Sequence, residues 1–261
     1  MFEFRRMILI DTHTHLYVEE FKEDVDAVIA RGKEQGVEKF YLPAIDSTEI
    51  PGMLALEEKY PGTCIAMMGL HPCYVKQNYR EELQIVKDWL DRRSFAAVGE
   101  IGLDYYWDTQ FKEQQQEAFR QQMDWALEKG MPIVIHTRNA MQETIEMVKP
   151  YAARGLKGIF HCFSGSYESA MQITQMGFML GIGGVLTYKN AGLGEVLAQI
   201  GMEHLVLETD SPYLTPVPFR GKRNESSYLK YVVAKLSDVK QLPEAEVAAI
   251  TTANAERLFE G

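Results

Sequence analysis

Short runs of apolar, β-prone residues recur along the chain, and most of them are continuously apolar rather than alternating with polar residues. Runs of this kind are typical of parallel strands that are covered on both faces. The pattern therefore predicts eight strands, at Met7–Ile10, Lys39–Leu42, Cys64–Met68, Ala96–Val98, Ile133–Ile135, Gly158–Phe160, Phe178–Ile182 and Leu205–Leu207.

The stretches between these runs carry apolar residues at helical spacing, as within residues 21–29, 83–90, 111–127 and 247–258. Asn78 and Ser166 stand where helix N-caps are expected. Gly130 stands where a helix ends, and Pro243 is expected in the first turn of the last helix. Strands and helices thus alternate from one end of the chain to the other.

Eight strands alternating with helices over 261 residues predict a TIM-type (β/α)8 barrel, with a doubly wound open sheet as the alternative. We find no linker, internal repeat or low-complexity tract. The sequence therefore predicts a single domain that spans residues 1–261.

Composition adds limits on function. Hydrophobic residues make up 46% of the chain, which is enough for a large core, and the formal net charge is -10. An acidic surface repels duplex DNA at long range, which argues against a loose, histone-like DNA binder. It argues only weakly against a nuclease, because metals and a few arginines can bind nucleic acid locally.

The three cysteines, Cys64, Cys73 and Cys162, show no CxxC spacing and are odd in number, which favours free thiols in a reducing compartment. Arg5 and Arg6 are followed by only four apolar residues, too few for a signal peptide. No stretch approaches the length of a membrane span. We therefore expect a cytoplasmic protein with no membrane association, and no obligate protein partner is evident.

Side chains that can bind metals follow most of the predicted strands. In a β/α barrel the carboxyl ends of the strands meet at one rim, where barrel enzymes place their catalytic residues. These residues are His13 and His15 after the first strand, His71 after the third, Glu100 after the fourth, His136 after the fifth, His161 after the sixth and Asp210 after the eighth.

A histidine pair such as His13 and His15 is weak evidence by itself, because one surface histidine and one packed histidine is the commoner explanation. Residues two apart in an extended segment point to the same side, so both imidazoles could bind one cation. Five of the six histidines follow predicted strands. This pattern favours a metal site, and we interpret the exception, His204, as a connector residue.

Glu100 stands in an apolar stretch, where a carboxylate is costly to bury unless it is paired or metal-bound. We predict that it bridges two cations, in preference to an ion pair with lysine or arginine. Asp210 could bind a metal and accept a proton from the attacking water, so Asp210 and Glu100 are the predicted catalytic residues. Glu208 either orients a ligand or substrate or forms a structural ion pair.

Three arginines are candidates for contacting an anionic substrate. Arg138 lies two residues after His136 and could bind such a substrate or form a salt bridge at the rim. Arg220 and Arg223 belong to the compact basic stretch at residues 220–224, which is either a solvated loop or a phosphate-binding one.

Three aromatic residues lie shortly after Glu100 in the chain. They could stack on nucleic-acid bases, although a lid or core position is slightly favoured. These residues are Tyr105, Tyr106 and Trp107.

Taken together, these motifs identify a family resemblance. The whole chain resembles the TatD-like metal-dependent DNases of the amidohydrolase superfamily. No single motif is specific, but their order along nearly the whole sequence is. The matching segments are Asp11–Leu16, Gly69–Pro72, Gly99–Tyr105, Pro132–Arg138, Phe160–Gly165, Glu208–Leu214 and Arg220–Glu225.

The resemblance implies a TIM barrel with a two-metal site. It implies that His13, His15, Glu100 and Asp210 hold one metal, that Glu100, His136 and His161 hold the other, and that His71 and Arg138 contact the substrate phosphate. The chain departs from the family pattern at Cys73, Asn139 and Ser226, where the family often has histidine, aspartate and proline. These departures bear on substrate preference.

The expected activity is hydrolysis of DNA phosphodiester bonds, 3'-5' exonuclease-like, with two divalent metal ions. Four imidazoles favour zinc or another transition metal, whereas the resemblance implies magnesium or manganese. The alternative is a superfamily hydrolase acting on a small ester, amide or phosphoester. Many such relatives carry a modified lysine where this chain has Glu100, which favours the DNase-like branch. A binding protein with a vestigial metal site is a third reading, disfavoured because every proposed ligand is present.

Overall fold

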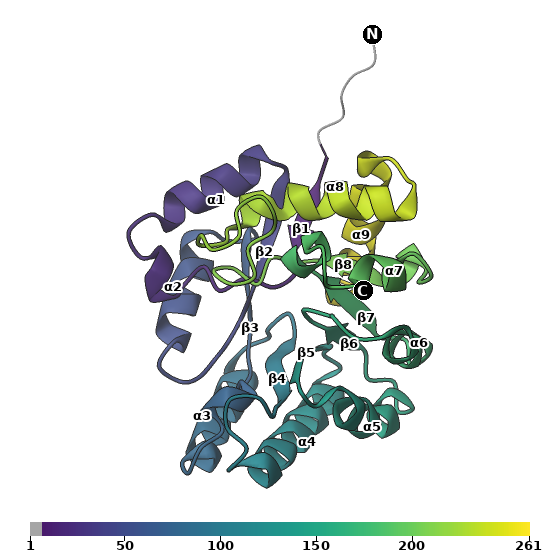
Figure 1. Cartoon of the computed structure of the whole chain (residues 1–261). Coiled ribbons are helices and arrows are strands. Elements are labelled where there is room, and N and C mark those ends of the chain that lie inside the picture. Colours follow the sequence, from purple (N-terminus) through teal and green to yellow (C-terminus); the bar gives the residue numbers. More distant parts are fainter. Residues whose placement is uncertain (1–6) are drawn as a thin grey trace.

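The computed structural model describes residues 7–261; residues 1–6, which include Arg5 and Arg6, lie outside the described part. Within that part, eight short strands alternate with helices (Figure 1). The strands are β1 (Leu9–Asp11), β2 (Val37–Pro43), β3 (Cys64–Met67), β4 (Val98–Asp104), β5 (Ile133–Arg138), β6 (Gly158–Phe160), β7 (Met179–Ile182) and β8 (Leu205–Leu207).

The helices lie outside the strands, with their apolar stripes directed inward. The α-helices are α1 (Val25–Glu34), α2 (Ile50–Lys59), α3 (Tyr79–Arg92), α4 (Lys112–Lys129), α5 (Met141–Ala152), α6 (Tyr167–Gln175), α7 (Leu193–Leu197), α8 (Leu229–Lys240) and α9 (Glu244–Phe259). Five 3-10 turns complete the described elements, at η1 (Glu19–Phe21), η2 (Pro72–Tyr74), η3 (Gly184–Thr187), η4 (Met202–His204) and η5 (Ser226–Tyr228).

Most of the predicted helix ends are confirmed. The Ser166 hydroxyl accepts from the Ser169 backbone N–H and so caps α6. Gly130 ends α4 in the left-handed conformation that glycine adopts without strain. Asn78 occupies the N-cap position of α3, but its side chain makes no capping bond. Pro243 is at the N-cap of α9 rather than in its first turn.

The strands are all parallel and close into a barrel. β1–β3 pair in sequence order, and β4–β8 do the same. A parallel bridge between Met68 and Val98 joins β3 to β4, and a bridge between Thr14 and Ser211 joins the segments after β1 and β8. The Thr12 N–H also donates to the Leu207 carbonyl at 3.0 Å. The prediction of a (β/α)8 barrel is confirmed, and the open-sheet alternative is wrong.

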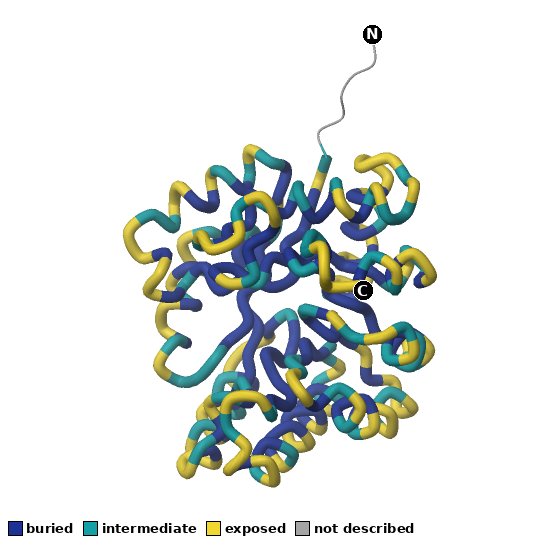
Figure 2. The backbone as a smooth tube through the Cα atoms, in the orientation of Figure 1, coloured by how far each residue is buried: buried dark blue, intermediate teal, exposed yellow. Residues whose placement is uncertain are grey.

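The half of the barrel interior away from the C-terminal ends of the strands, called the lower layer below, is filled by apolar side chains. Each strand, or the residue next to it, contributes one of them. Ala255 and Leu258 of α9 join this layer, and the Phe259 ring stacks on the Tyr41 ring with centroids 4.0 Å apart. The strands are therefore buried, as Figure 2 shows, and α9 covers their N-terminal ends. The layer consists of Ile10, Tyr41, Met67, Ala97, Val134, Ile159, Met179 and Val206.

Three strands, β2, β4 and β5, are longer than predicted. Glu100 lies within β4 and His136 within β5, whereas we expected both residues to follow their strands. The predictions ended each strand where its apolar run ended. Side chains two apart on a strand share a face, so His136 lies above Val134 in the barrel interior. The strand therefore continues past its apolar run, and its polar residues face the mouth of the barrel. Within residues 7–261, none of the helices is both long and apolar enough to cross a bilayer.

Candidate metal centre

The C-terminal mouth of the barrel brings the predicted metal ligands together around Glu100, which is 2% exposed. Glu100 Oε2 lies 3.1 Å from His13 Nε2 and 3.7 Å from His15 Nε2. Glu100 Oε1 lies 3.0 Å from both His136 Nδ1 and His161 Nε2. The two carboxylate oxygens therefore face two different groups of imidazoles.

Asp210 completes the first group. Its Oδ1 lies 3.7 Å from His13 Nε2 and 3.6 Å from His15 Nε2. Three sets of residues, which share some members, could each hold a metal ion, because the donor atoms within each set lie within 4.8 Å of one another. They are His13 with Glu100 and His161, His13 with His15 and Asp210, and His71 with Glu100 and His136.

Backbone pairing beyond the ends of β1 and β8 brings this first group together. The Asp210 N–H donates to the His13 carbonyl at 2.9 Å, and the His15 N–H donates to the Ser211 carbonyl at 2.8 Å. Asp210 has a φ of 54°, a left-handed conformation that costs free energy in most residues and that aspartate tolerates better than most. The barrel closure that joins the first and last strands thus also places Asp210 beside the histidine pair.

Buried Asp11 supports the same junction. Its Oδ1 accepts from the Thr209 N–H at 2.9 Å, and its Oδ2 accepts from the Thr209 hydroxyl at 2.6 Å. Burial raises the pKa of Asp11 to about 7, against the opposing effect of these hydrogen bonds. Asp11 therefore ties the end of β1 to the residue before Asp210.

Two of the histidines have the ring nitrogen that faces away from Glu100 hydrogen-bonded to a partner, and in a third, His161, that nitrogen faces a carboxylate. The Tyr17 hydroxyl donates to the Pro43 carbonyl, so its oxygen is free to accept from His15 Nδ1–H at 2.9 Å. His136 Nε2 lies 2.9 Å from Asp104 Oδ2. Such partners fix the tautomer and leave the other nitrogen with a free lone pair.

Glu208 is the partner of the third histidine. It is fully buried, and its Oε1 lies 3.4 Å from His161 Nδ1 and accepts from the Cys162 N–H at 2.5 Å. Gly181 makes room for it, since a Cβ there would lie 2.1 Å from Glu208 Oε2. Glu208 thus lies behind the histidine, where it can orient the ring.

His71 differs from the other histidines of the cluster. Its Nδ1 accepts from the Cys73 backbone N–H at 3.1 Å. Because a neutral imidazole carries only one proton, that proton is on Nε2, which lies 3.3 Å from Glu100 Oε1. His71 therefore presents a hydrogen-bond donor to the mouth, which suits contact with an anionic oxygen better than metal ligation.

The electrostatics of the cluster favour ionised carboxylates. Burial alone would raise the pKa of Glu100, but His161, His71 and His13 outweigh it and hold that pKa well below its usual range. Burial is likewise outweighed at Asp210, where the hydrogen bond to His15 and nearby histidines lower the pKa. Within residues 7–261 no lysine or arginine pairs with either carboxylate. A buried carboxylate and a partly buried one, with imidazole nitrogens around them, are a donor set that fits divalent cations.

The arginines predicted to contact substrate fall into two classes. Arg138 and Arg220 are exposed, with the Arg138 guanidinium 3.7 Å from the Tyr106 ring centroid and that of Arg220 4.2 Å from the Tyr188 ring centroid. Arg223 instead donates to Asp24 at 2.8 and 2.7 Å and to the Glu20 carbonyl at 2.6 Å. The structure therefore gives Arg223 a role in attaching its loop to the segment before α1.

The three aromatic residues after β4 differ in burial. Tyr105 packs against the core, as the sequence favoured. Tyr106 and Trp107 are 51% and 69% exposed, so a core position is wrong for them.

Sequence reasoning did not assign roles to three of the supporting residues, Asp11, Tyr17 and Asp104. Asp11 and Asp104 belong to the matched motifs, and a carboxylate at the end of an apolar strand was a usable signal for both. Tyr17 gave no comparable signal, because its role depends on the Pro43 carbonyl of a neighbouring strand.

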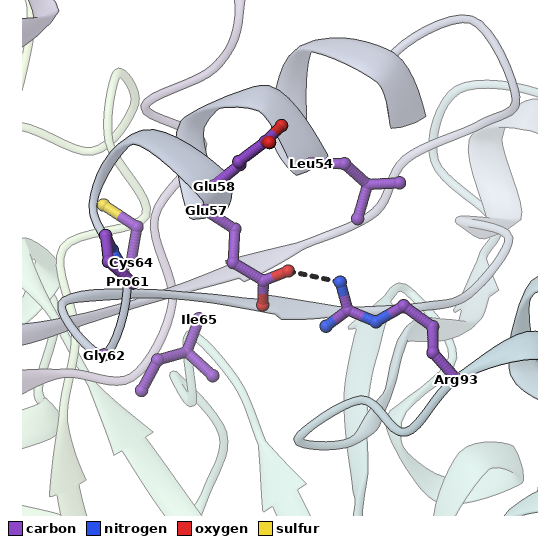
Figure 3. Close-up of a pocket in the computed structure, with 8 residues that line it drawn as sticks. All are labelled: Leu54, Glu57, Glu58, Pro61, Gly62, Cys64, Ile65 and Arg93. Carbon is purple, nitrogen blue, oxygen red and sulfur yellow. Dashed lines mark hydrogen bonds and ion pairs between the residues drawn. The ribbon is translucent and has the colours of Figure 1, made fainter.

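A separate pocket of about 600 Å³ lies at the opposite end of the barrel, beside the start of β3 (Figure 3). The Glu57–Arg93 ion pair, 2.5 Å long, crosses it. None of the candidate metal ligands contributes to this pocket, which is lined by Leu54, Glu57, Glu58, Pro61, Gly62, Cys64, Ile65 and Arg93.

Comparison with known proteins identifies the family. Residues 10–260 match the family described as TatD related DNase. The chain belongs to this family. An uncharacterized metal-dependent hydrolase, YabD from Bacillus subtilis (strain 168), is 41% identical over 253 residues, which cover 97% of this chain and 99% of YabD.

Two further members of the TatD family are similar over their whole length. The 3'-5' ssDNA/RNA exonuclease TatD from Erwinia tasmaniensis is 30% identical over 257 residues, covering 96% of this chain and 99% of that protein. The crystal structure of YjjV, a TatD homolog from Escherichia coli, has a TM-score of 0.92 and 30% identity, covering 98% of this chain and 100% of YjjV. The protein is accordingly a metal-dependent hydrolase of the TatD family.

Proposed function

We propose that this protein is a deoxyribonuclease that cleaves DNA phosphodiester bonds, in the manner of a 3'-5' exonuclease, with two divalent metal ions. The observation that carries the proposal is the position of Glu100, whose two oxygens face separate groups of imidazoles. A carboxylate so placed can bridge two cations, and paired cations suit the displacement of one phosphate oxygen by another.

The donor set divides between two ions as follows. His13, His15, Glu100 and Asp210 would hold one ion, and Glu100, His136 and His161 the other. When bound, the ions supply Lewis acidity that polarises the phosphate and lowers the pKa of water. The four imidazoles favour zinc or another transition metal, and magnesium or manganese remain the alternatives to be tested.

The residues of the mouth have distinct tasks in this proposal. Asp210 orients the attacking water and accepts its proton, and its lowered pKa keeps it ionised for that task. The His71 Nε2–H and the exposed Arg138 guanidinium donate to the phosphate oxygens on which charge builds. Glu208, Asp104 and Tyr17 act through the histidines that they orient.

A nucleic-acid substrate is favoured over a small ester or amide by two observations. The relative from Erwinia tasmaniensis, matched over its whole length, is described as a 3'-5' ssDNA/RNA exonuclease. Two arginines are exposed at or beyond the C-terminal ends of strands: Arg138 is the last residue of β5, and Arg220 lies in the segment after β8. Within an acidic chain, this local positive charge suits a polyanion.

The test is digestion of end-labelled single- and double-stranded DNA with zinc, magnesium or manganese in turn, beside a panel of small esters and amides. We expect stepwise nucleotide release with at least one metal. The Asp210→Asn variant should keep much of its bound metal and lose hydrolysis by a factor of about 10² or more. Turnover of small esters or amides without DNA cleavage would assign the protein to the alternative class, and near-normal DNA cleavage by Asp210→Asn would remove its role as base.

We also propose that the enzyme works in the cytoplasm. All three cysteines, Cys64, Cys73 and Cys162, are free thiols, as is usual in a reducing compartment.

A further inference from the structure

Large apolar side chains that are exposed gather at the mouth of the barrel. Tyr74, Tyr106, Trp107, Tyr213 and Val217 all lie in segments that follow strands of the barrel and are between 43% and 69% exposed. In the part of the chain that the structure describes, the other exposed large apolar side chains are Ile8 and Ile85. Of the residues at the mouth, Tyr106 and Trp107 are in contact, with ring centroids 4.9 Å apart, and exposed aromatic side chains beside a polar site commonly mark a binding surface.

Tyr106 and Trp107 are held in place rather than left free. Asp104 Oδ1 accepts from the Tyr106 N–H at 2.9 Å and from the Trp107 N–H at 3.1 Å. The other oxygen of the same carboxylate lies 2.9 Å from His136 Nε2. The aromatic pair is therefore fixed to a candidate metal ligand through one side chain.

The guanidinium of Arg138 lies beside this aromatic pair. It is 3.7 Å from the Tyr106 ring centroid and 5.2 Å from that of Trp107, and the Tyr105 N–H donates to the Arg138 carbonyl at 2.9 Å. Within residues 7–261 no carboxylate forms an ion pair with Arg138, so its donors are available to a ligand. Stacking on Tyr106 leaves those donors at the edge of the guanidinium plane.

Resting on the nuclease proposed above, we infer that Tyr106, Trp107 and Arg138 form a subsite that stacks one unpaired nucleobase next to the phosphate being cleaved. Trp107 offers the most exposed ring of the mouth to the base, and Arg138 pairs with the adjoining phosphate. Base stacking on an aromatic ring is independent of base identity and contributes about 1–3 kcal/mol per base.

This subsite distinguishes unpaired from paired nucleotides. A base within a duplex has both faces covered by its neighbours, so it can stack on Trp107 only after leaving the helix, which costs a few kcal/mol. The structure thus favours single-stranded ends over blunt duplex ends, through residues other than the metal ligands.

The first experiment compares Trp107→Ala and Trp107→Phe with the wild type, and uses Ile85→Ala as a control for loss of an exposed apolar side chain on α3. The substrates are a single-stranded oligonucleotide and the same oligonucleotide with abasic residues at its 3' end. We expect Trp107→Ala to lower kcat/KM on the first substrate roughly 10-fold, as 1–3 kcal/mol of lost stacking implies. On the abasic substrate it should equal the wild type. Trp107→Phe should lie between the two.

The second experiment measures binding without cleavage. In the Asp210→Asn background, a single-stranded oligonucleotide should quench the emission of Trp107, and the added Trp107→Phe change should remove most of that quenching. The other two tryptophans, Trp89 and Trp125, lie on α3 and α4 and serve as an internal reference.

The outcomes separate the two proposals. Cleavage that is insensitive to Trp107→Ala, or reduced equally on both substrates, overturns the subsite and leaves the nuclease standing. Quenching by base-containing but not abasic oligonucleotide, without cleavage by the wild type, supports the subsite and overturns the nuclease. An absence of both quenching and cleavage overturns both.

Discussion

At the scale of single residues, the metal centre depends on which nitrogen of each imidazole faces inward. Tyr17 and Asp104 each hold an outward nitrogen, of His15 and His136 respectively. Glu208 lies behind His161 in the same way. His71 has the opposite arrangement, with its outward nitrogen accepting a hydrogen bond. The partners of the rings therefore distinguish the candidate metal ligands from His71, which donates a hydrogen bond, within one cluster of histidines.

We predict that Asp104→Asn weakens metal binding about 10–100-fold, as loss of a carboxylate behind a ligating histidine typically does. The reason is that the neutral amide holds the His136 Nε2–H less firmly than a carboxylate. Calorimetric titration with zinc or manganese measures the effect. Asp108→Asn is the matched control, since Asp108 lies in the same loop but pairs with Lys76. Equal affinities for the two variants would contradict the positioning role of Asp104.

At the scale of elements, the basic loop at residues 220–224 is bound to α1 and the segment before it at its C-terminal end, and is exposed to solvent at its N-terminal end. Arg223 is bound to Asp24, before α1, and stacks 4.5 Å from the Phe21 ring centroid. Arg31 of α1 bonds Glu225 at 2.9 and 2.6 Å. These contacts hold the loop against α1 and leave Arg220 at the surface.

The two arginines of this loop should therefore respond differently to removal. Arg223→Met should lower Tm by a few degrees, since about 1 kcal/mol corresponds to roughly 2–4 °C for a chain of this size, with KM for DNA unchanged. Arg220→Met should leave Tm unchanged, raise KM several-fold and reduce the salt dependence of binding. Calorimetry and DNA kinetics at several salt concentrations distinguish the variants, and a reversed result would assign phosphate contact to Arg223.

The anchoring of the loop should also be sensitive to acid. Burial disfavours the charged form of Glu225, but hydrogen bonds from Arg31 and Ser227 outweigh it and hold the pKa of Glu225 below its usual range. A lowered pKa in the folded state stabilises the fold above the unfolded-state pKa, and this stabilisation is lost as pH falls through the folded value.

Glu225→Gln should consequently be less stable than the wild type at neutral pH, by about 1–2 kcal/mol for a hydrogen-bonded charge that is largely buried. The difference should shrink below about pH 4, where the wild-type carboxylate becomes protonated. Urea unfolding at a series of pH values measures both. Glu19→Gln, which alters the exposed Lys22–Glu19 pair, should show almost no effect at any pH. A difference that grows toward low pH would refute this interpretation of Glu225.

At the scale of the whole molecule, the barrel has an apolar end and a polar end. The lower layer of the barrel is closed by α9, and the upper mouth holds buried carboxylates that no lysine or arginine within residues 7–261 neutralises. The candidate ligands come from different strands and meet only in the folded state, so a metal ion that binds them binds that state alone. Bound metal should therefore stabilise the entire fold.

We predict that chelation of divalent metal lowers Tm by roughly 10 °C, since metal at 1,000 times its Kd contributes about 4 kcal/mol to the folded state. Adding zinc or manganese back should restore Tm. The double variant His13→Ala with His15→Ala should show little response to either treatment. If Tm stayed constant while bound metal was removed, the cluster would not be a metal centre.

The sequence by itself determined the order of strands and helices, the barrel, and the residues at its mouth. This information is local: an uninterrupted apolar run indicates a buried strand, and a polar residue at its end indicates the rim. Glu100 and His136 were predicted as ligands although their strands extend past them. The strand ends were misplaced because a polar interior residue looks, in one dimension, like the end of a strand.

Only the tertiary structure decided what each polar group does. His136 lies within hydrogen-bond distance of Asp104 on a neighbouring strand, and Arg223 bonds Asp24 from the other end of the chain. Trp107 is exposed to solvent. Hydrogen-bond partners and exposure depend on residues brought together by barrel closure, which no local pattern records. The tautomer of His71 and the availability of Arg138 are set in the same way, by the neighbours that folding supplies.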